Sequence, residues 1–383
     1  MKVTGIKSFI VTPNQGKHLL FVKVETDEGI EGWGESYTQS DRVKTVVAHI
    51  EDIGRYLIGR DPSNIKHFSQ IVYDDFASKR GAIDMFSALS GMEQALWDIN
   101  GKALGVPVYK LLGGKYRSKV RVYANGWAGG ANTSDEELCK RAAALVERGF
   151  TAMKFDPYPG PWRTFIDKKD EDFGVRRVKA VREAVGPDVD ILIENHRRFS
   201  PYHALRIARR MEEFNPYWFE EPVDGMNIDA LAYVNHRTDL GVVTGEAMYT
   251  KKEFRAVFEA QAADIINPDI CNCGGILSIR EIGAMAEAYD VAISPHNYNS
   301  TTMGLAATVQ ACATMPNFII TEYFVNFEDL GRLCIKPLEL KDGYILLDDS
   351  RPGLGVNMNE EALLKEGYAD FPMRKLREFY DEM

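Results

Sequence analysis

Several features are scarce in this sequence, and each scarcity excludes a class of protein. Five cysteines in 383 residues are odd in number and widely spread, which argues against a disulfide framework and favours reduced thiols in a cytoplasmic protein. No segment approaches the roughly 18 consecutive apolar residues of a membrane span. The start of the chain lacks the apolar core and the small-residue cleavage site of a signal peptide. The net charge of −10 also argues against binding to an anionic membrane, so we expect no membrane partner.

Basic residues are also scarce relative to acidic ones. The chain has 46 Lys and Arg against 56 Asp and Glu, a net charge of −10, which argues against a nucleic-acid partner. The phosphate-loop patterns GxGxxG and GxxxxGK[ST] do not occur, and we interpret the glycines of 32–34 and 274–275 as turn residues. The Cys-Asn-Cys of 271–273 is too tightly spaced for a zinc motif. An anionic small substrate stays compatible with this charge, because a bound divalent cation reverses the local field.

The hydrophobic pattern changes near residue 116. Apolar and alternating runs at 6–11 and 19–25, with a turn between them, predict an antiparallel hairpin, and helical periodicity follows from about 43 to 112. From about 119 a short apolar strand followed by an amphipathic helix recurs eight times. Eight such units predict a parallel sheet closed into a barrel. Helix starts are marked by a capping box at Ser134 and Glu137 and by Ser200 before Pro201.

These patterns predict an α/β protein with a (β/α)-barrel, a modified TIM barrel, and an α+β capping domain. We place the N-terminal capping segment at 1–115, the barrel at 116–332, and a C-terminal segment at 333–383 that returns to the capping domain. A further hairpin is expected at 338–348. The predicted barrel strands are 120–123, 152–156, 190–194, 217–220, 242–246, 264–269, 291–296 and 317–322.

Nearly every predicted barrel strand ends on a polar residue, at the face where active sites of such barrels lie. Glu194, Glu220 and Glu246 are spaced 26 residues apart, one strand–helix unit each. Three carboxylates on adjacent strands would repel one another unless a cation lies among them. A single glutamate here would be interpreted as a helix cap, but three in register predict a Mg²⁺ site.

The next strands end in Asp269 and His296. Asp269 is expected to accept a hydrogen bond from one imidazole nitrogen of His296, so that the other nitrogen acts as a base. The eighth strand ends in Glu322, which would contact a substrate oxygen. His196 lies two residues after Glu194 and is expected to face the same cavity as an acid; a loop histidine bonded to the backbone is the alternative.

On the second strand, Lys154 and Asp156 share one face. We expect Lys154 to contact a substrate carboxylate and Asp156 a sugar hydroxyl, with a local salt bridge as the alternative interpretation. Tyr37, Arg80, Trp127 and Tyr158 lie in predicted loops and are candidates for contacts to distal hydroxyls. The remaining histidines are interpreted as structural.

Together these segments resemble the enolase superfamily in its mandelate racemase-like branch. The resemblance rests on motifs over nearly the whole chain, namely Ala-Leu-Trp-Asp at 95–98, Glu-Glu-Pro at 220–222, Gly-Glu at 245–246, Pro-Asp at 268–269 and Pro-His at 295–296. It implies that Glu194, Glu220 and Glu246 bind Mg²⁺ and that Asp269 and His296 form the base dyad. The chemistry implied by the resemblance is proton abstraction by a Lys or His base, with the metal stabilising an ene-diolate.

Within that branch the segments 122–127, 154–157 and 191–199 resemble acid-sugar dehydratases, gluconate and galactonate dehydratases above all. This implies a small sugar-acid substrate, a 2-keto-3-deoxy product and a homo-oligomer. Two residues depart from the pattern: Asp156 stands where racemases often have a second lysine, and the first metal position is Glu194 in place of the commoner Asp. The alternatives are an epimerase, racemase or cycloisomerase on the same scaffold, and a non-catalytic metal-binding homologue. An unrelated aldose–ketose isomerase barrel is disfavoured by the Asp269–His296 dyad.

Overall fold

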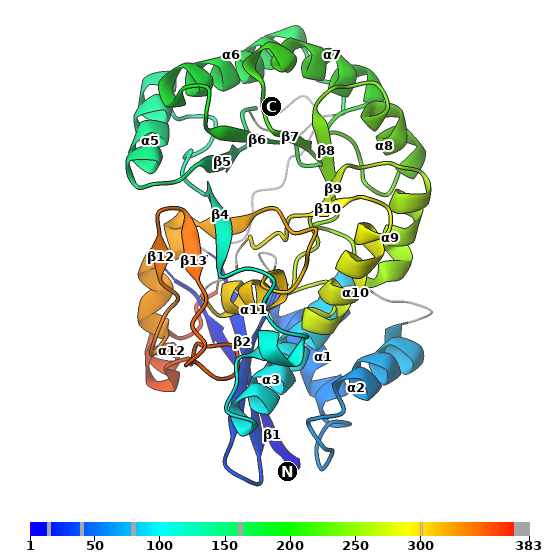
Figure 1. Cartoon of the computed structure of the whole chain (residues 1–383), viewed down its shortest axis with the longest axis vertical. Helices are drawn as coiled ribbons and strands as arrows, with labels where there is room; N and C mark the ends of the chain where they lie inside the picture. The colour runs from blue at the N-terminus through cyan, green and yellow to red at the C-terminus, as the bar shows by residue number, and fades with distance from the viewer. Residues whose placement is uncertain are drawn as a thin grey trace.

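A computed structural model describes residues 1–13, 17–38, 42–77, 82–159, 164–298, 300 and 302–370. A barrel occupies the upper part of Figure 1, and a smaller domain built from the N-terminal segment lies below it. The fold class predicted from the sequence is confirmed, because β-strands alternate with helices in one parallel sheet and an α+β domain caps it.

The capping domain contains an antiparallel sheet in the order β1 (Val3–Val11), β2 (Leu19–Thr26) and β3 (Glu31–Ser36). The hairpin predicted for 6–11 and 19–25 is therefore present. The interpretation of Gly32 and Gly34 as turn residues is wrong, because both lie inside β3. A Cβ at Gly32 would lie 2.0 Å from the Ala95 carbonyl oxygen, and one at Gly34 would lie 2.0 Å from that of Gly91. Glycine is required there so that a helix can pack directly on the strand.

That helix is α3 (Ile83–Ala103), which is buried along most of its length. It is preceded by α1 (Val43–Gly54), α2 (Ile65–Ile71) and the π-helical turn η1 (Val72–Ala77), and followed by α4 (Val108–Leu111). Apolar side chains of β2, α1 and α3 form a core of their own under the barrel. The region 43–112, for which helical periodicity was predicted, thus forms several helices, and α3 is the longest of them.

The barrel strands are β4 (Lys119–Asn125), β5 (Ala152–Phe155), β6 (Asp190–Glu194), β7 (Trp218–Glu220), β8 (Gly241–Thr244), β9 (Ile265–Ile266), β10 (Ala292–Ile293) and β11 (Thr321–Phe324). Neighbours from β4 to β10 pair in parallel and in chain order, and β11 returns to pair with β4. A single bridge from Ile293 to Phe318 joins β10 to the segment before β11. The barrel is therefore closed.

The helices between the barrel strands are α5 (Asp135–Glu147), α6 (Lys168–Val185), α7 (Pro201–Met211), α8 (Ile228–Asn235), α9 (Thr250–Glu259), α10 (Gly275–Glu287) and α11 (Thr302–Cys312), with the 3₁₀ turn η2 (Glu212–Phe214) after α7. Ser134 and Ser200 accept the hydrogen bonds expected of N-caps. An eighth α-helix was expected, but the 3₁₀ segment η3 (Val325–Leu333) follows β11. Its buried residues recur every three positions, at Phe327, Leu330 and Leu333, which suits a 3₁₀ helix.

The C-terminal segment contacts both domains. The predicted hairpin is present as β12 (Leu340–Lys341) and β13 (Tyr344–Leu346), but β13 pairs with β4 of the barrel and not with the capping sheet. Beyond it, the Leu354 amide donates to Asp98 of α3, and α12 (Glu360–Glu366) packs beside β1. Among the described residues, no helix is both long and apolar enough to cross a lipid bilayer.

Candidate active site

Three glutamates meet where β6, β7 and β8 end. Glu194 and Glu220 are paired in register, and Glu246 follows the glycine after β8. Each offers a carboxylate oxygen, and these oxygens all lie within 4.8 Å of one another. The equal spacing in the sequence thus corresponds to a similar depth in the barrel, because parallel strands end on the same face.

The deepest of these carboxylates is Glu220, which is fully buried. It accepts hydrogen bonds from Lys154 Nζ at 2.8 Å and from Asn267 Nδ2 at 2.7 Å. Burial, together with the neighbouring charge of Glu194, raises the pKa of Glu220 well above its usual value despite the lysine. The site therefore concentrates more negative charge than its own lysine neutralises, which is what a divalent cation would relieve.

Lys154, predicted as a carboxylate contact, lies at the centre of this cluster. Its Nζ is 3.5 Å from both Glu194 and Glu322, and the side chain is only 2% exposed. Lys154 thus forms ion pairs with glutamates on other strands, and it also lines the cavity described below. These ion pairs and the predicted contact with a substrate carboxylate are therefore compatible in one structure.

Asp269 and His296 lie side by side on neighbouring strand ends, joined by a single parallel bridge. His296 Nδ1 is 2.7 Å from Asp269 Oδ2, and His296 Nε2 is 3.0 Å from Glu246 Oε2. Burial lowers the pKa of His296, but Glu322 and Glu246 outweigh that effect and raise it well above the usual histidine range. Glu322 itself accepts hydrogen bonds from the Asn297 amide and the Asn125 side chain.

His196 lies at the other end of the glutamate row. Its backbone amide donates to Glu194 Oε1 at 2.6 Å, and its Nδ1 is 2.9 Å from Asp156 Oδ2. Arg198 donates to the same carboxylate oxygen of Asp156. Burial lowers the pKa of His196, but Glu194 and Asp156 raise it to about 8. Asp156 is thus engaged by two cationic or polar partners and not left open as a base.

Arg197 is a site residue that the sequence reasoning did not select. It adopts φ of 60° next to His196 at 50°, a left-handed conformation uncommon outside glycine. Arg197 NH1 donates to Glu246 Oε1 at 2.7 Å and also to Glu221. The two consecutive left-handed residues bring the chain after β6 back to the carboxylates. The polar run after β6 was the available signal, but composition alone does not reveal such a turn.

A cavity of about 660 Å³ opens above these residues. Its lining includes the predicted residues Tyr37, Lys154, Asp156, Glu194, His196, Glu246 and His296, and the unpredicted residues Lys17, Asn125, Arg197 and Tyr298. The lining does not include three candidates for substrate contact, namely Glu322, Trp127 and Tyr158. Glu322 is fully buried. Trp127 is buried with its Nε1 on the Lys154 carbonyl oxygen, and the Tyr158 hydroxyl lies beside Met211 Sδ. Arg80 falls outside the described residues.

Lys17 brings an amino group from the capping domain into this cavity. Its Nζ lies 3.7 Å from the centre of the Tyr298 ring and 5.0 Å from that of Phe324, and it contacts the Tyr298 hydroxyl. Burial lowers the pKa of Lys17 to about 7, against a smaller opposing effect of Glu322. A lone lysine in a loop carries no pattern that separates it from surface lysines, so sequence reasoning could not have found it.

A cap over a closed barrel, with a carboxylate cluster and an Asp–His dyad at the strand ends, is the arrangement of a barrel enzyme whose active site lies at that face. Residues 7–113 match the mandelate racemase / muconate lactonizing enzyme N-terminal domain, and residues 137–362 match the enolase C-terminal domain-like family. The chain therefore belongs to the mandelate racemase/muconate lactonizing enzyme family of the enolase superfamily.

Relatives of this chain are similar over most of their length. A D-galactonate dehydratase of Variovorax paradoxus is 36% identical over 95% of this chain and 94% of its own. A D-gluconate dehydratase of Thermoproteus tenax is 36% identical over 90% of this chain and 69% of its own. A solved mandelate racemase/muconate lactonizing enzyme of Jannaschia superposes with a TM-score of 0.90, at 31% identity over 96% of this chain and 98% of that one.

Proposed function

We propose that the protein is a Mg²⁺-dependent dehydratase of a sugar acid such as galactonate or gluconate. It would remove the proton next to the carboxylate and eliminate the β-hydroxyl, giving a 2-keto-3-deoxy sugar acid. The observation that carries the proposal is the placement of two histidines at opposite ends of one carboxylate row. His296 lies beside Glu246 and His196 beside Glu194, and both line the same cavity. Dehydratases among the relatives support this interpretation.

The residues present fit a hard divalent cation. Glu194, Glu220 and Glu246 supply only carboxylate oxygens, within 4.8 Å of one another, which is the donor type that Mg²⁺ prefers. Glu194 and Glu220 are buried and Glu246 is nearly so. These three side chains would hold the ion. When bound, it would supply Lewis-acid stabilisation of the negative charge that develops on the substrate carboxylate.

The dyad supplies the base. Asp269 is buried and only accepts when ionised, so it would hold a proton on His296 Nδ1. A cation held by the glutamates would offset the charge of Glu246 that raises the pKa of His296, which would leave Nε2 to accept the α-proton of the substrate. His296 Nε2 lies close to Glu246, so a substrate carbon above the carboxylate row would be within its reach. Positioned acid–base groups of this kind contribute about 10²–10⁴-fold in rate.

The departing hydroxyl needs a proton on the other side. His196 Nδ1 is engaged by Asp156, which fixes the ring, and we assign donation of the proton to Nε2. The C–O bond breaks as this proton is transferred, water leaves, and the enol gains a proton at C3 to become the keto acid. Asp156 already has His196 and Arg198 as partners, so it is a poor second base for racemisation.

Recognition of the rest of the substrate falls to the cavity wall. Lys154 is close enough to the carboxylate row to contact a substrate carboxylate, and Tyr37, Asn125 and Lys17 line the walls where hydroxyls would lie. Trp127 and Tyr158 support the wall from behind, since each packs in the core and does not reach the cavity.

The test is proton NMR in D₂O across sugar-acid diastereomers, including galactonate and gluconate. The wild type should convert one C2 epimer to a 2-keto-3-deoxy acid. His296→Asn should lose both α-proton exchange and dehydration. His196→Asn should slow dehydration far more than exchange, about 10²-fold or more.

His203→Asn is the matched control, because this histidine is bonded to Glu171 on the outer helices and does not line the cavity. Its kinetics should equal those of the wild type. Accumulation of the C2 epimer without keto acid would reject dehydration and favour an epimerase. Absence of any exchange or product with every sugar acid would contradict the proposed substrate class.

A further inference from the structure

The segment that carries Asp269 is held by hydrogen bonds from the capping domain as well as from the barrel. It runs from Asp269 to Leu277, between β9 and the first turn of α10. Its main chain folds around Asp269: the Cys271 amide donates to Asp269 Oδ1 at 2.7 Å, and the Cys273 amide donates to the Asp269 carbonyl at 2.8 Å. The position of this segment, together with the bridge between Asp269 and His296, therefore contributes to where the Asp269 carboxylate lies.

Helix α10 has no N-cap side chain of its own, because its N-cap is Gly274 with φ of 107°. Its first amide donors are satisfied from another domain. The Glu93 carboxylate of α3 accepts from the Ile276 amide at 2.7 Å and from the Leu277 amide at 2.8 Å. Unpaired donors at a helix start need such partners when buried, and a carboxylate also matches the positive end of the helix dipole.

Two more side chains of α3 bond the same segment. The Gly274 amide donates to Ser90 Oγ at 2.9 Å. Gln94 Nε2 donates to the Ile270 carbonyl at 3.2 Å, and Gln94 Oε1 accepts from the Glu35 amide of β3 at 3.0 Å. Ser90, Glu93 and Gln94 are all fully buried.

The contact between Glu93 and the start of α10 depends on a glycine at position 275. A Cβ at Gly275 would lie 2.1 Å from Glu93 Oε2, and its φ of 90° is in the left-handed region. Only glycine lets the carboxylate come so close to the start of α10. The Gly274-Gly275 pair, interpreted from sequence as turn glycines, is thus also a docking point for the capping domain.

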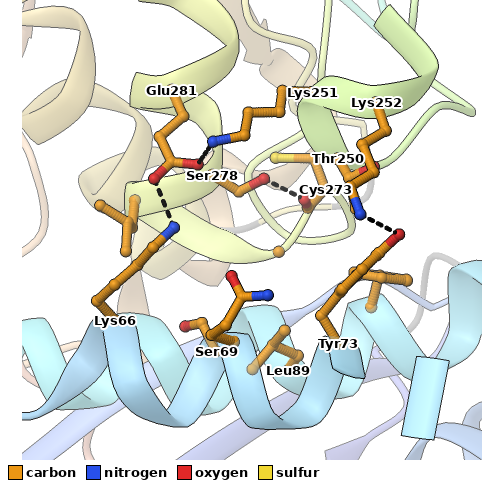
Figure 2. A pocket seen from close by; sticks show the side chains of 14 residues that line it. Lys66, Ser69, Tyr73, Leu89, Thr250, Lys251, Lys252, Cys273, Ser278 and Glu281 are labelled. Carbon is orange, nitrogen blue, oxygen red and sulfur yellow. Dashed lines mark hydrogen bonds and ion pairs between the residues drawn. The ribbon is translucent and has the colours of Figure 1, made fainter. Parts of the chain in front are cut away.

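An outer layer of contacts joins the same two domains nearer to solvent. Figure 2 shows Lys66 and Lys251 reaching Glu281, at 2.6 Å and 2.8 Å, around a small surface pocket. In the same view Ser278 donates to the Cys273 carbonyl at 2.7 Å, inside the segment that Glu93 caps. The lysines are about half exposed, so this layer is an exposed ion-pair network whose loss should change little.

We propose that Glu93, assisted by Ser90 and Gln94, is a positioning residue for the Asp269–His296 dyad, so that the capping domain takes part in proton abstraction. This role of Glu93 rests on the proposed function only for the effect we expect on the kinetics. Residues 1–115 would then contribute to proton abstraction, because buried hydrogen bonds from α3 hold the segment that carries Asp269.

The first test is the kinetics of Glu93→Gln. The two carboxylate oxygens of Glu93 accept from two different amides, whereas a glutamine has one oxygen and a donating NH₂ group. One amide at the start of α10 therefore faces a donor in the variant. We expect kcat and α-proton exchange to fall together by about 10-fold or more, with KM within about 2-fold of wild type.

The matched control is Asp98→Asn. Asp98 is a buried carboxylate on the same helix that bonds the Trp33 and Leu354 amides but not the 269–277 segment. Asp98→Asn and Lys66→Ala, normalised to folded protein, should keep the wild-type kcat. Equal kcat losses in Glu93→Gln and Asp98→Asn would overturn the proposal.

A second measurement needs no substrate. Amide hydrogen exchange of 269–277 should quicken about 10-fold or more in Glu93→Gln and not in Asp98→Asn. Unchanged exchange there would overturn the proposal even if the protein proved inactive on every sugar acid. If Glu93→Gln does not fold, Ser90→Ala should show a several-fold loss of kcat with faster exchange of this segment, and wild-type values would overturn the proposal.

Discussion

Individual residues at the site are defined less by their type than by their partners. His196 and His296 are both histidines beside a glutamate, yet Asp156 holds one and Asp269 the other, on opposite sides of the carboxylate row. Lys17 differs again, because aromatic faces surround its ammonium group. These partners give the same functional groups different tasks.

At this scale Lys17 makes a prediction about stability. Burial lowers its pKa to about 7 in the folded protein, from 10.5. Between these values the unfolded chain binds the proton and the folded protein does not, so the lysine destabilises the fold most below pH 7 and progressively less as the pH rises toward 10.5. Lys17→Met should therefore raise the free energy of unfolding by on the order of 1–3 kcal/mol at pH 6, and by less at pH 9.

Denaturant unfolding at the two pH values measures this difference. Lys336→Met, at an exposed position, is the control and should show no pH-dependent gain. An equal gain for Lys17→Met at both pH values would argue that its effect comes from packing alone.

At the scale of elements, the contact between β3 and α3 decides how the capping domain is built. The strand and the helix approach so closely that the two glycines of β3 lie against helix carbonyls. This unit also carries Glu35, Ser90 and Gln94, which bond to each other or to the barrel. A change in the packing of this unit would therefore also change its hydrogen bonds to the barrel.

Gly34→Ala should destabilise the protein by about 3 kcal/mol or more, because its Cβ would lie 2.0 Å from the Gly91 carbonyl oxygen. Gly241→Ala is the matched control, a glycine at the start of β8 where a Cβ would meet the Tyr217 carbonyl oxygen at 3.4 Å. It should change the free energy of unfolding by less than about 1 kcal/mol. Chemical denaturation compares them, and similar losses in both would contradict the close-packing account.

At the scale of the whole molecule, the carboxylate cluster links metal binding to folding. A cation that binds the folded protein and not the unfolded chain stabilises it by about 2.7 kcal/mol at a concentration of 100 Kd. The proposed site therefore predicts a Tm that rises by several degrees with Mg²⁺ and falls back with EDTA.

Glu220→Gln should fold, lose turnover and show no rise in Tm with Mg²⁺, because it removes the deepest of the three carboxylates. Glu259→Gln, which alters an exposed carboxylate on α9, should respond to Mg²⁺ as the wild type does. Full activity of EDTA-treated enzyme, or an unaltered response of Glu220→Gln, would count against the metal site.

The sequence by itself determined the barrel, the order of its strands and the meeting of the three glutamates. Those features follow from local periodicity, since each strand–helix unit returns the chain to the same face of the sheet, so residues one unit apart become neighbours. The Asp269–His296 contact follows in the same way from adjacent strand ends.

Only the tertiary structure decided the contacts made between distant segments. In the folded protein the glycines of β3 contact helix α3, and the C-terminal hairpin pairs with β4. Trp127 and Tyr158 are buried behind the cavity wall. The tertiary structure also brought Lys17 to Tyr298 and Glu93 to the start of α10. Such contacts depend on how whole domains dock, and docking leaves no period in the chain, because the partners lie far apart in the sequence and share no repeat.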